Sequence, residues 1–175
     1  MAAVVSYEQS FKTGAAIGKY PVVMKAPFSY QQFVKTYQVT TDDELAIGDL
    51  ATVISGKLDL PVDKSLLTLV IILDSPHNQA ILEHRGKTPS KTELFKAADD
   101  PVEVLILIPG FVLSVKLAAT NLIALGSKLC TSADDGDTRL LAVSATDEPA
   151  AKIGTALSVS TSGTGIGYIA MLVGN

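Results

Sequence analysis

Two histidines and their neighbours are the first residues in this sequence that could do chemistry. His77 and His84 are the only histidines of the chain, and Asp74 and Ser75 lie just before His77. Serine, histidine and aspartate form nucleophilic triads, but a triad needs a specific geometry, and no serine lies in a G-x-S-x-G turn. A metal site would need a third ligand from elsewhere, and no H-E-x-x-H motif is present. We therefore expect both histidines to have surface or loop roles.

Three further patterns resemble functional motifs but lack essential parts. The acidic segment 134–137 has neither the residue order nor the distant glutamate of an EF-hand, so it is interpreted as a hairpin turn. The glycine-rich segment 162–167 is followed by too few residues for the βαβ unit of a dinucleotide site. Cys130, the single cysteine, lies in a predicted strand and is expected to be buried and unreactive. The sequence thus predicts no catalytic residues, no cofactor and no metal site, and a protein that is not an enzyme.

Aromatic side chains are concentrated at the start of the chain. Seven of the ten Phe and Tyr residues precede residue 40. Up to Thr41 the chain also has four lysines and a single glutamate, although the net charge of the whole chain is −4. Pro21 and Pro27 interrupt this segment, and Gly14 and Gly18 oppose a helical course. We predict that residues 1–40 form an extended arm and that residues 41–175 form one β-rich body domain.

Aromatic rings on an extended arm give a large contact area for little loss of conformational entropy. They could pack on the chain's own body, or they could anchor the arm to a capsid or to a neighbouring subunit. In the second interpretation the arm carries the partner-binding residues, and its lysines face an acidic surface. Those residues are Tyr7, Phe11, Lys12, Tyr20, Phe28, Tyr30 and Phe33.

Short apolar runs separated by Gly, Pro and Asp turns dominate the body. The runs 66–73 and 102–108 are typical of buried strands, and further strands are expected up to the terminal run 166–173. An S-x-x-E capping box at Ser90 predicts a helix over 91–98, whereas the course of residues 41–60 fits either a helix or strands. The predicted fold class is mainly β, an antiparallel β-barrel or sandwich with one or two short helices and the extended N-terminal arm.

A short internal echo connects the two halves of the body. The segments 46–50 (AIGDL) and 124–129 (ALGSKL) both place a glycine turn before an apolar strand. The match is too short to establish a repeat from the sequence.

Composition excludes several classes of protein. The 175 residues are 47% hydrophobic but 18% charged, whereas an ordinary globular domain has about 25% charged residues. The net charge of −4 with two arginines argues against nucleic-acid binding. The N-terminus does not match a secretory signal, and no apolar run is long enough for a membrane span. We expect neighbours in an assembly to cover part of the apolar surface.

From Ile106 to Asn175 the chain resembles the small head decoration (cement) proteins of tailed bacteriophages. The resemblance is carried by ILIPGFVLSVKLAA, IALGSKLCTSADDGDTRLLAVSA and AKIGTALSVSTSGTGIGYIAMLV. These segments contain a strand, a glycine turn into a second strand, an acidic hairpin, an I-G-x-A-L strand over 153–157 and a glycine loop before the last strand. The resemblance implies a β-barrel-like body that binds the outer face of an assembled capsid. It also implies a homo-oligomer, a trimer at local threefold axes with a dimer as the alternative.

These expectations combine into one predicted function. The protein is expected to be a virion component on the outer capsid surface, with the major capsid protein and copies of itself as partners. It would stabilise the capsid by bridging neighbouring capsid subunits, because many modest contacts add up over a shell. The alternatives are another self-assembling virion component, such as a shell or tail subunit, or a small hydrolase that uses His77 or His84.

Overall fold

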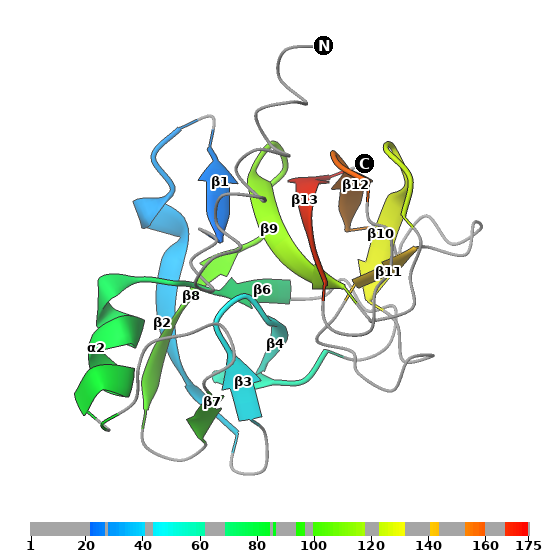
Figure 1. The fold of residues 1–175 in the computed structure, drawn as a ribbon. Coiled ribbons are helices and arrows are strands. Elements are labelled where there is room, and N and C mark those ends of the chain that lie inside the picture. Colours follow the sequence, from blue (N-terminus) through cyan, green and yellow to red (C-terminus); the bar gives the residue numbers. More distant parts are fainter. Residues whose placement is uncertain are drawn as a thin grey trace.

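The computed structural model of this protein is built mostly from short β-strands, which form two closed sheets side by side (Figure 1). The sheets are called the first and second barrel below. The structure describes residues 22–26, 28–40, 44–61, 69–84, 86, 94–96, 100–117, 123–131, 141–143, 153–159 and 167–174.

In the described part of the chain, the first barrel is a closed ring of five strands in the order β2-β5-β4-β6-β8. Neighbouring strands are antiparallel except β2 and β5, which are parallel. A tight hairpin joins β4 to β5, and its central residues Ser55 and Gly56 have φ angles of 51° and 81°. Positive φ at both positions is the requirement of a type I′ hairpin turn. The strands are β2 (Val34–Val39), β4 (Leu50–Ile54), β5 (Lys57–Asp59), β6 (Leu69–Ile72) and β8 (Pro101–Ile106).

The second barrel is formed by the second half of the chain. Its strands follow the order β9-β11-β10-β12-β13, and the ring closes because β13 also pairs with β9. A further strand, β1 (Val23–Lys25), lies outside this ring and pairs with β9. The ring strands are β9 (Val112–Leu117), β10 (Lys128–Thr131), β11 (Leu141–Val143), β12 (Gly154–Ala156) and β13 (Gly167–Val173).

The two barrels are equivalent strand by strand. In chain order, β2, β4, β5, β6 and β8 correspond to β9, β10, β11, β12 and β13, with the same neighbours and directions, including the parallel pair. The registers also match, because Val34 faces Leu105 in the first barrel as Val112 faces Leu172 in the second. The structure therefore contains an internal duplication, of which the sequence echo at 46–50 and 124–129 is a remnant.

The two glycine turns of that echo share the same geometry. The first glycine turn (46–49) and the second glycine turn (124–127) each have a hydrogen bond from the fourth amide to the first carbonyl, at 3.0 and 3.1 Å. Gly48 and Gly126, at the third position, both have φ of 84°, the left-handed value that a type II turn requires there. The Gly48 amide donates to the carbonyl of Ile72, the last residue of β6, at 2.9 Å. The Gly126 amide donates to the carbonyl of Ala156, the last residue of β12, at the same distance.

The first half of the chain carries two additions that the second half lacks among its described residues. The helix α2 (Pro76–His84) follows β6, and β3 (Glu44–Ala46) pairs with β7 (Leu94–Lys96). Asn78 of α2 is fully buried and binds the strand ends beneath it. Its Nδ2 donates to Leu73 O and Glu103 O at 2.9 Å, and its Oδ1 accepts from Glu103 N at 2.8 Å.

The predicted fold class, mainly β, is confirmed. β6 and β13 lie within the predicted runs 66–73 and 166–173, and β8 overlaps the predicted run 102–108. The segment 41–60 contains the strands β3, β4 and β5. The helix predicted over 91–98 is wrong, because pairing with β3 draws 94–96 into a strand. The helix α2, by contrast, was not predicted.

The predicted limit of the arm at residue 40 is corrected by the strands between residues 22 and 40. β1 pairs with β9, and β2 is a full member of the first barrel. Val22 is completely buried, and its carbonyl accepts a hydrogen bond from Ser114 N at 2.9 Å. Residues 1–21 lie outside the described residues, so for them the arm stays a prediction.

Candidate interaction surfaces

Phe28, Phe33 and Phe111 meet where the chain passes between the barrels. The ring centroid of Phe28 lies 5.7 Å from that of Phe33 and 5.3 Å from that of Phe111. The centroids of Phe33 and Phe111 are 6.2 Å apart. Phe33 and Phe111 occupy equivalent places, since each directly precedes the first strand of its barrel. Such ring pairs contribute about 0.5–1.5 kcal/mol beyond simple burial. The cluster therefore holds the segment between β1 and β2 on the body.

Of the residues predicted to bind a partner, the structure describes Phe28, Tyr30 and Phe33. Phe28 remains 45% exposed and Tyr30 36% exposed, although Phe28 contacts the cluster with one side of its ring. Phe33 is partly buried against the core. The other predicted residues, Tyr7, Phe11, Lys12 and Tyr20, lie outside the described residues.

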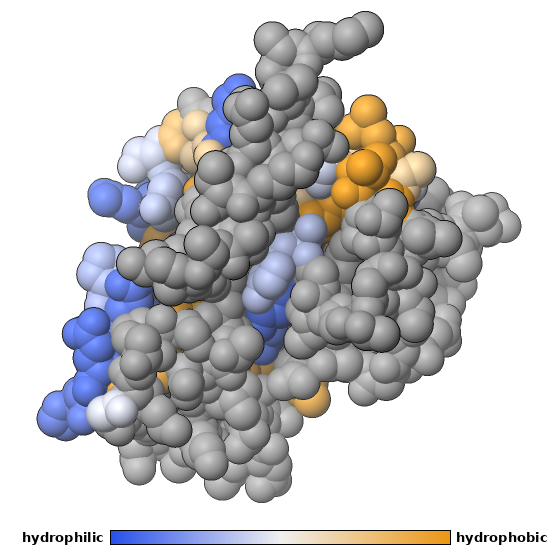
Figure 2. Space-filling view, in the orientation of Figure 1, coloured by the Kyte–Doolittle hydropathy of each residue, from blue (hydrophilic) through white to orange (hydrophobic). Residues whose placement is uncertain are grey.

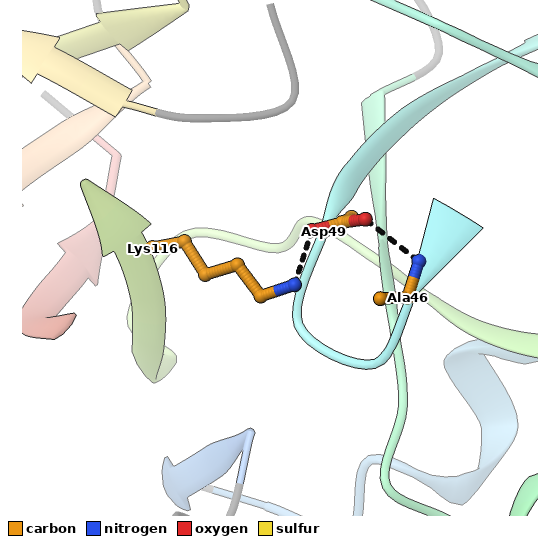
Figure 3. Close-up of polar contacts among 3 residues, drawn as sticks. All are labelled: Ala46, Asp49 and Lys116. Atoms are coloured by element: carbon orange, nitrogen blue, oxygen red, sulfur yellow. Dashed lines mark hydrogen bonds and ion pairs between the residues drawn. The ribbon is translucent and has the colours of Figure 1, made fainter. Parts of the chain in front are cut away.

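A buried ion pair joins the two barrels (Figure 3). Lys116 of β9 donates from Nζ to Oδ1 of Asp49 in the first glycine turn. The Lys116 side chain is 5% exposed and that of Asp49 is 4% exposed. Oδ2 of Asp49 accepts from Ala46 N at 2.7 Å, so both carboxylate oxygens are bound. Sequence reasoning missed this pair, although a lysine inside an apolar strand was a signal.

An open pocket of about 580 Å³ lies along β2, beside the beginning of α2. Its lining includes Tyr30, Lys35, Asp74 and Glu103, so it combines an aromatic ring, a cation and two carboxylates. The volume is within the range of small-ligand sites, about 300–1,000 Å³. The pocket lies over β2 and the neighbouring Glu103 of β8, beside the residues that lead into α2.

Asp74 and Ser75, which resembled part of a triad in the sequence, make structural hydrogen bonds. Ser75 Oγ accepts from Asn78 N at 3.2 Å, the bond of a helix N-cap at the start of α2. Asp74 Oδ2 accepts from Val22 N at 3.3 Å. Ser75 thus caps α2, and Asp74 connects the residue before β1 to the segment that leads into α2.

The histidines lie on the surface of α2. His77 Nε2 is 3.1 Å from Pro101 O, and His84 is exposed at the end of the helix. Within the described ranges, no three His, Cys, Asp or Glu side chains gather where they could hold a metal ion. Cys130 is buried in β10, as predicted. None of the described helices is long and apolar enough to cross a membrane.

Apolar side chains are exposed near the ends of β10 and β12. Leu125, in the second glycine turn, is 54% exposed, and Val159, just after β12, is 56% exposed. Hydrogen bonds between the second glycine turn and Ala156 bring these two segments together. Figure 2 shows an apolar patch in this region, at the upper right of the molecule.

No protein-family model and no curated protein sequence matches this chain. Among solved structures, the chain is similar to the crystal structure of the head fiber gp8.5 N base in bacteriophage phi29. The sequence identity is 14% and the TM-score is 0.46, and the alignment covers 81% of this chain and 94% of that chain. This likeness concerns the arrangement of strands and carries no conclusion about function.

Proposed function

We propose that this protein is a structural component of a phage virion that binds the outer surface of the assembled capsid and bridges neighbouring capsid subunits. The observation that carries the proposal is where the segments that resemble decoration proteins lie in the fold. They contribute β9, β10, β11, β12 and β13, which are the five ring strands of the second barrel. The resemblance thus falls on one contiguous structural unit.

Gly154 gives part of that resemblance a physical reason. It is the glycine of the I-G-x-A-L segment and lies in β12, between β10 and β13. A Cβ atom at this position would lie 2.3 Å from Leu172 O and 2.7 Å from Met171 Cγ. The glycine is therefore required for close packing of β12 beside β13. This supports the view that the resemblance of this segment to decoration proteins reflects shared packing and not only shared composition.

A bridging protein needs two contact areas held at a fixed relative position. The duplication supplies two like barrels, and the Asp49–Lys116 pair and the Phe28–Phe33–Phe111 cluster hold them together. Exposed apolar side chains such as Leu125 and Val159 offer surface that a partner could bury. Repeated over a shell, modest contacts of this kind add up to a stabilised capsid.

The test is the occupancy of purified heads by this protein, measured by gel densitometry and electron microscopy after adding it to heads that lack it. We expect saturable binding and survival of the decorated heads at temperatures that open bare ones. A protein that stays in the supernatant at all concentrations would overturn the proposal. Formation of closed shells or tubes by the protein alone would instead favour a shell or tail subunit.

The role of the arm is tested by deleting residues 1–21. The deletion must end there, because Val22 is buried and β1 pairs with β9. We expect the shortened protein to keep its thermal unfolding temperature and to lose capsid binding. A matched full-length variant with Tyr7, Phe11 and Tyr20 changed to serine should show the same loss. Unchanged occupancy of both variants would remove the arm from the binding surface.

A structural role also predicts that the histidines are dispensable. We propose that the protein is not an enzyme, because Asp74 and Ser75 accept hydrogen bonds from backbone amides and His77 contacts a backbone carbonyl. Replacing His77 and His84 together by alanine should leave capsid occupancy unchanged. A hydrolytic activity of the purified protein that disappears in this variant would contradict the proposal.

A further inference from the structure

The two glycine turns have the same backbone structure but very different surroundings. In the first glycine turn, Ile47 and Asp49 are each 3% exposed, because the turn packs against β9 of the second barrel. A Cβ on Gly48 would lie 3.6 Å from Cε of Lys116, which shows how closely β9 approaches. In the second glycine turn, Leu125 occupies the place of Ile47 and is 54% exposed. The same structural element is thus covered in one barrel and open in the other.

The surface that covers the first glycine turn shows the matching difference. All residues of β9 from Val112 to Lys116 are buried. β1 pairs with Val112 and Leu113, and the first glycine turn contacts Lys116. The equivalent strand β2 exposes Lys35, Thr36 and Gln38. Gln38 is the counterpart of Lys116, since Val34 and Val112 occupy the same register position. Val34, Lys35 and Thr36 of this strand also line the open pocket of about 580 Å³.

Each barrel therefore has a turn surface, formed by its glycine turn, and a strand surface, formed by β2 or β9. Within one chain, only one turn surface and one strand surface are covered. The turn of the first barrel meets the strand of the second. If a twofold axis related the two barrels, the second glycine turn would also pack on β2. Leu125 and Gln38 are exposed, so the barrels are not related in this way. The contact between the barrels is therefore head-to-tail. It leaves two complementary surfaces uncovered, the second glycine turn of the second barrel and β2 of the first.

We propose that copies of this chain associate head-to-tail, with the second glycine turn of one copy seated on β2 of the next. The joint between copies then repeats the contact that the two barrels make within one chain. The occupant of both open surfaces is a second copy because each surface is equivalent to one that this chain already covers. A head-to-tail contact gives a closed ring if its rotation closes and a filament if it does not.

The first experiment measures the mass of the purified protein by light scattering over a concentration series. We expect oligomers, and we expect Leu125→Asp to raise their dissociation constant by about tenfold or more, because it places a charge in an apolar contact. Ala80→Asp is the control, since it places the same charge on the exposed face of α2, away from both surfaces. A protein that stays monomeric at all soluble concentrations, or equal effects of both variants, would overturn the proposal.

The second experiment distinguishes head-to-tail association from a symmetric dimer. Leu125→Asp blocks the turn surface and leaves β2 intact, whereas Gln38→Trp blocks β2 and leaves the turn intact. Each variant alone is expected to be monomeric, with an unchanged unfolding temperature. Mixed together, they should form a one-to-one complex that grows no further, because each supplies the surface that the other lacks. A mixture that stays monomeric contradicts the head-to-tail arrangement.

The third experiment builds the internal ion pair into the joint between copies. Ser127 and Gln38 are the counterparts of Asp49 and Lys116, so the double variant Ser127→Asp with Gln38→Lys reproduces the pair between neighbouring chains. Ser127→Asp with Gln38→Glu places two like charges there instead. We expect the first combination to associate at least about tenfold more tightly than the second. Equal association of the two combinations would show that these residues do not face one another.

The results of these three association experiments do not depend on the proposed capsid function. The association is measured on the purified protein without capsids, whereas the capsid proposal is tested by occupancy of heads. A monomeric Leu125→Asp variant that still binds heads would support both proposals and separate self-association from capsid binding. A protein that forms head-to-tail oligomers but never binds heads would overturn only the capsid function.

Discussion

Gly154 shows how a single residue is determined by the packing around it. Its place between β10 and β13 leaves no room for a side chain, because a Cβ would meet the backbone oxygen of Leu172 at 2.3 Å. We predict that Gly154→Ala destabilises the protein by about 3 kcal/mol or more, at or above the upper end of overpacking effects. The measurement is the free energy of unfolding by urea. The oxygen cannot retreat without breaking strand pairing, which is why we expect a large cost.

The control for this prediction is Gly56→Ala in the hairpin between β4 and β5. Gly56 has a φ of 81°, but a Cβ there would meet nothing within 4 Å. Only the backbone strain of the left-handed conformation should then count, roughly 1–2 kcal/mol. A cost of Gly154→Ala no larger than that of Gly56→Ala would show that β12 and β13 separate easily.

The ion pair of Asp49 and Lys116 gives a second prediction at the residue scale. Replacing Lys116 by methionine leaves the Asp49 carboxylate buried without its cation, and we expect a loss of about 3–5 kcal/mol in the free energy of unfolding. The double variant Asp49→Asn with Lys116→Met should recover part of this loss, because no buried charge is left. As a control, Lys57→Met on the exposed face of β5 should change stability by less than about 0.5 kcal/mol. Additive effects of the two substitutions would mean that the charges do not interact.

At the scale of elements, α2 is attached to the first barrel through its two buried side chains, Asn78 and Leu82, of which Asn78 makes the polar contacts. Asn78 is fully buried and satisfies Leu73 O together with both backbone groups of Glu103. We predict that Asn78→Ala costs about 1–3 kcal/mol for each buried group left without a partner. Hydrogen exchange of the α2 amides should accelerate more than that of the second barrel. Glu83→Ala, on the exposed face of the same helix, should leave both measurements unchanged; equal acceleration in both variants would rule out Asn78 as the anchor.

Elements also show what sequence patterns capture. The apolar runs that became β6, β8, β9 and β13 were predicted because short apolar runs rich in β-branched residues favour buried strands. The segment 94–96 carried a helix signal and became β7, because pairing with β3 outweighed a capping box. Helix α2 was missed because it buries only two side chains, Asn78 and Leu82, and the partners of Asn78 lie outside the helix.

At the scale of the whole molecule, the barrels are joined by the ion pair, by the phenylalanine cluster and by β1, which precedes the first barrel but pairs with the second. We predict that they unfold together in one transition. Reactivity of Cys130, buried in β10, reports on the second barrel, and amide exchange in β4 and β6 reports on the first. The two midpoints should coincide in the native protein and diverge in Lys116→Met. Separate midpoints in the native protein would show that the barrels are independent.

The sequence by itself determined the fold class, the burial of Cys130 and the positions of β6, β8 and the strands of the second barrel, because these depend on short apolar runs and on composition. It also displayed the echo at 46–50 and 124–129, but two glycine turns are too little to identify a duplication. Tertiary structure alone decided that β2 and β9 are equivalent, that Asp49 meets Lys116, and that Leu125 is open where Ile47 is covered. The physical reason is that strand order and register are set by pairings between distant segments, and such pairings leave almost no trace in the local sequence.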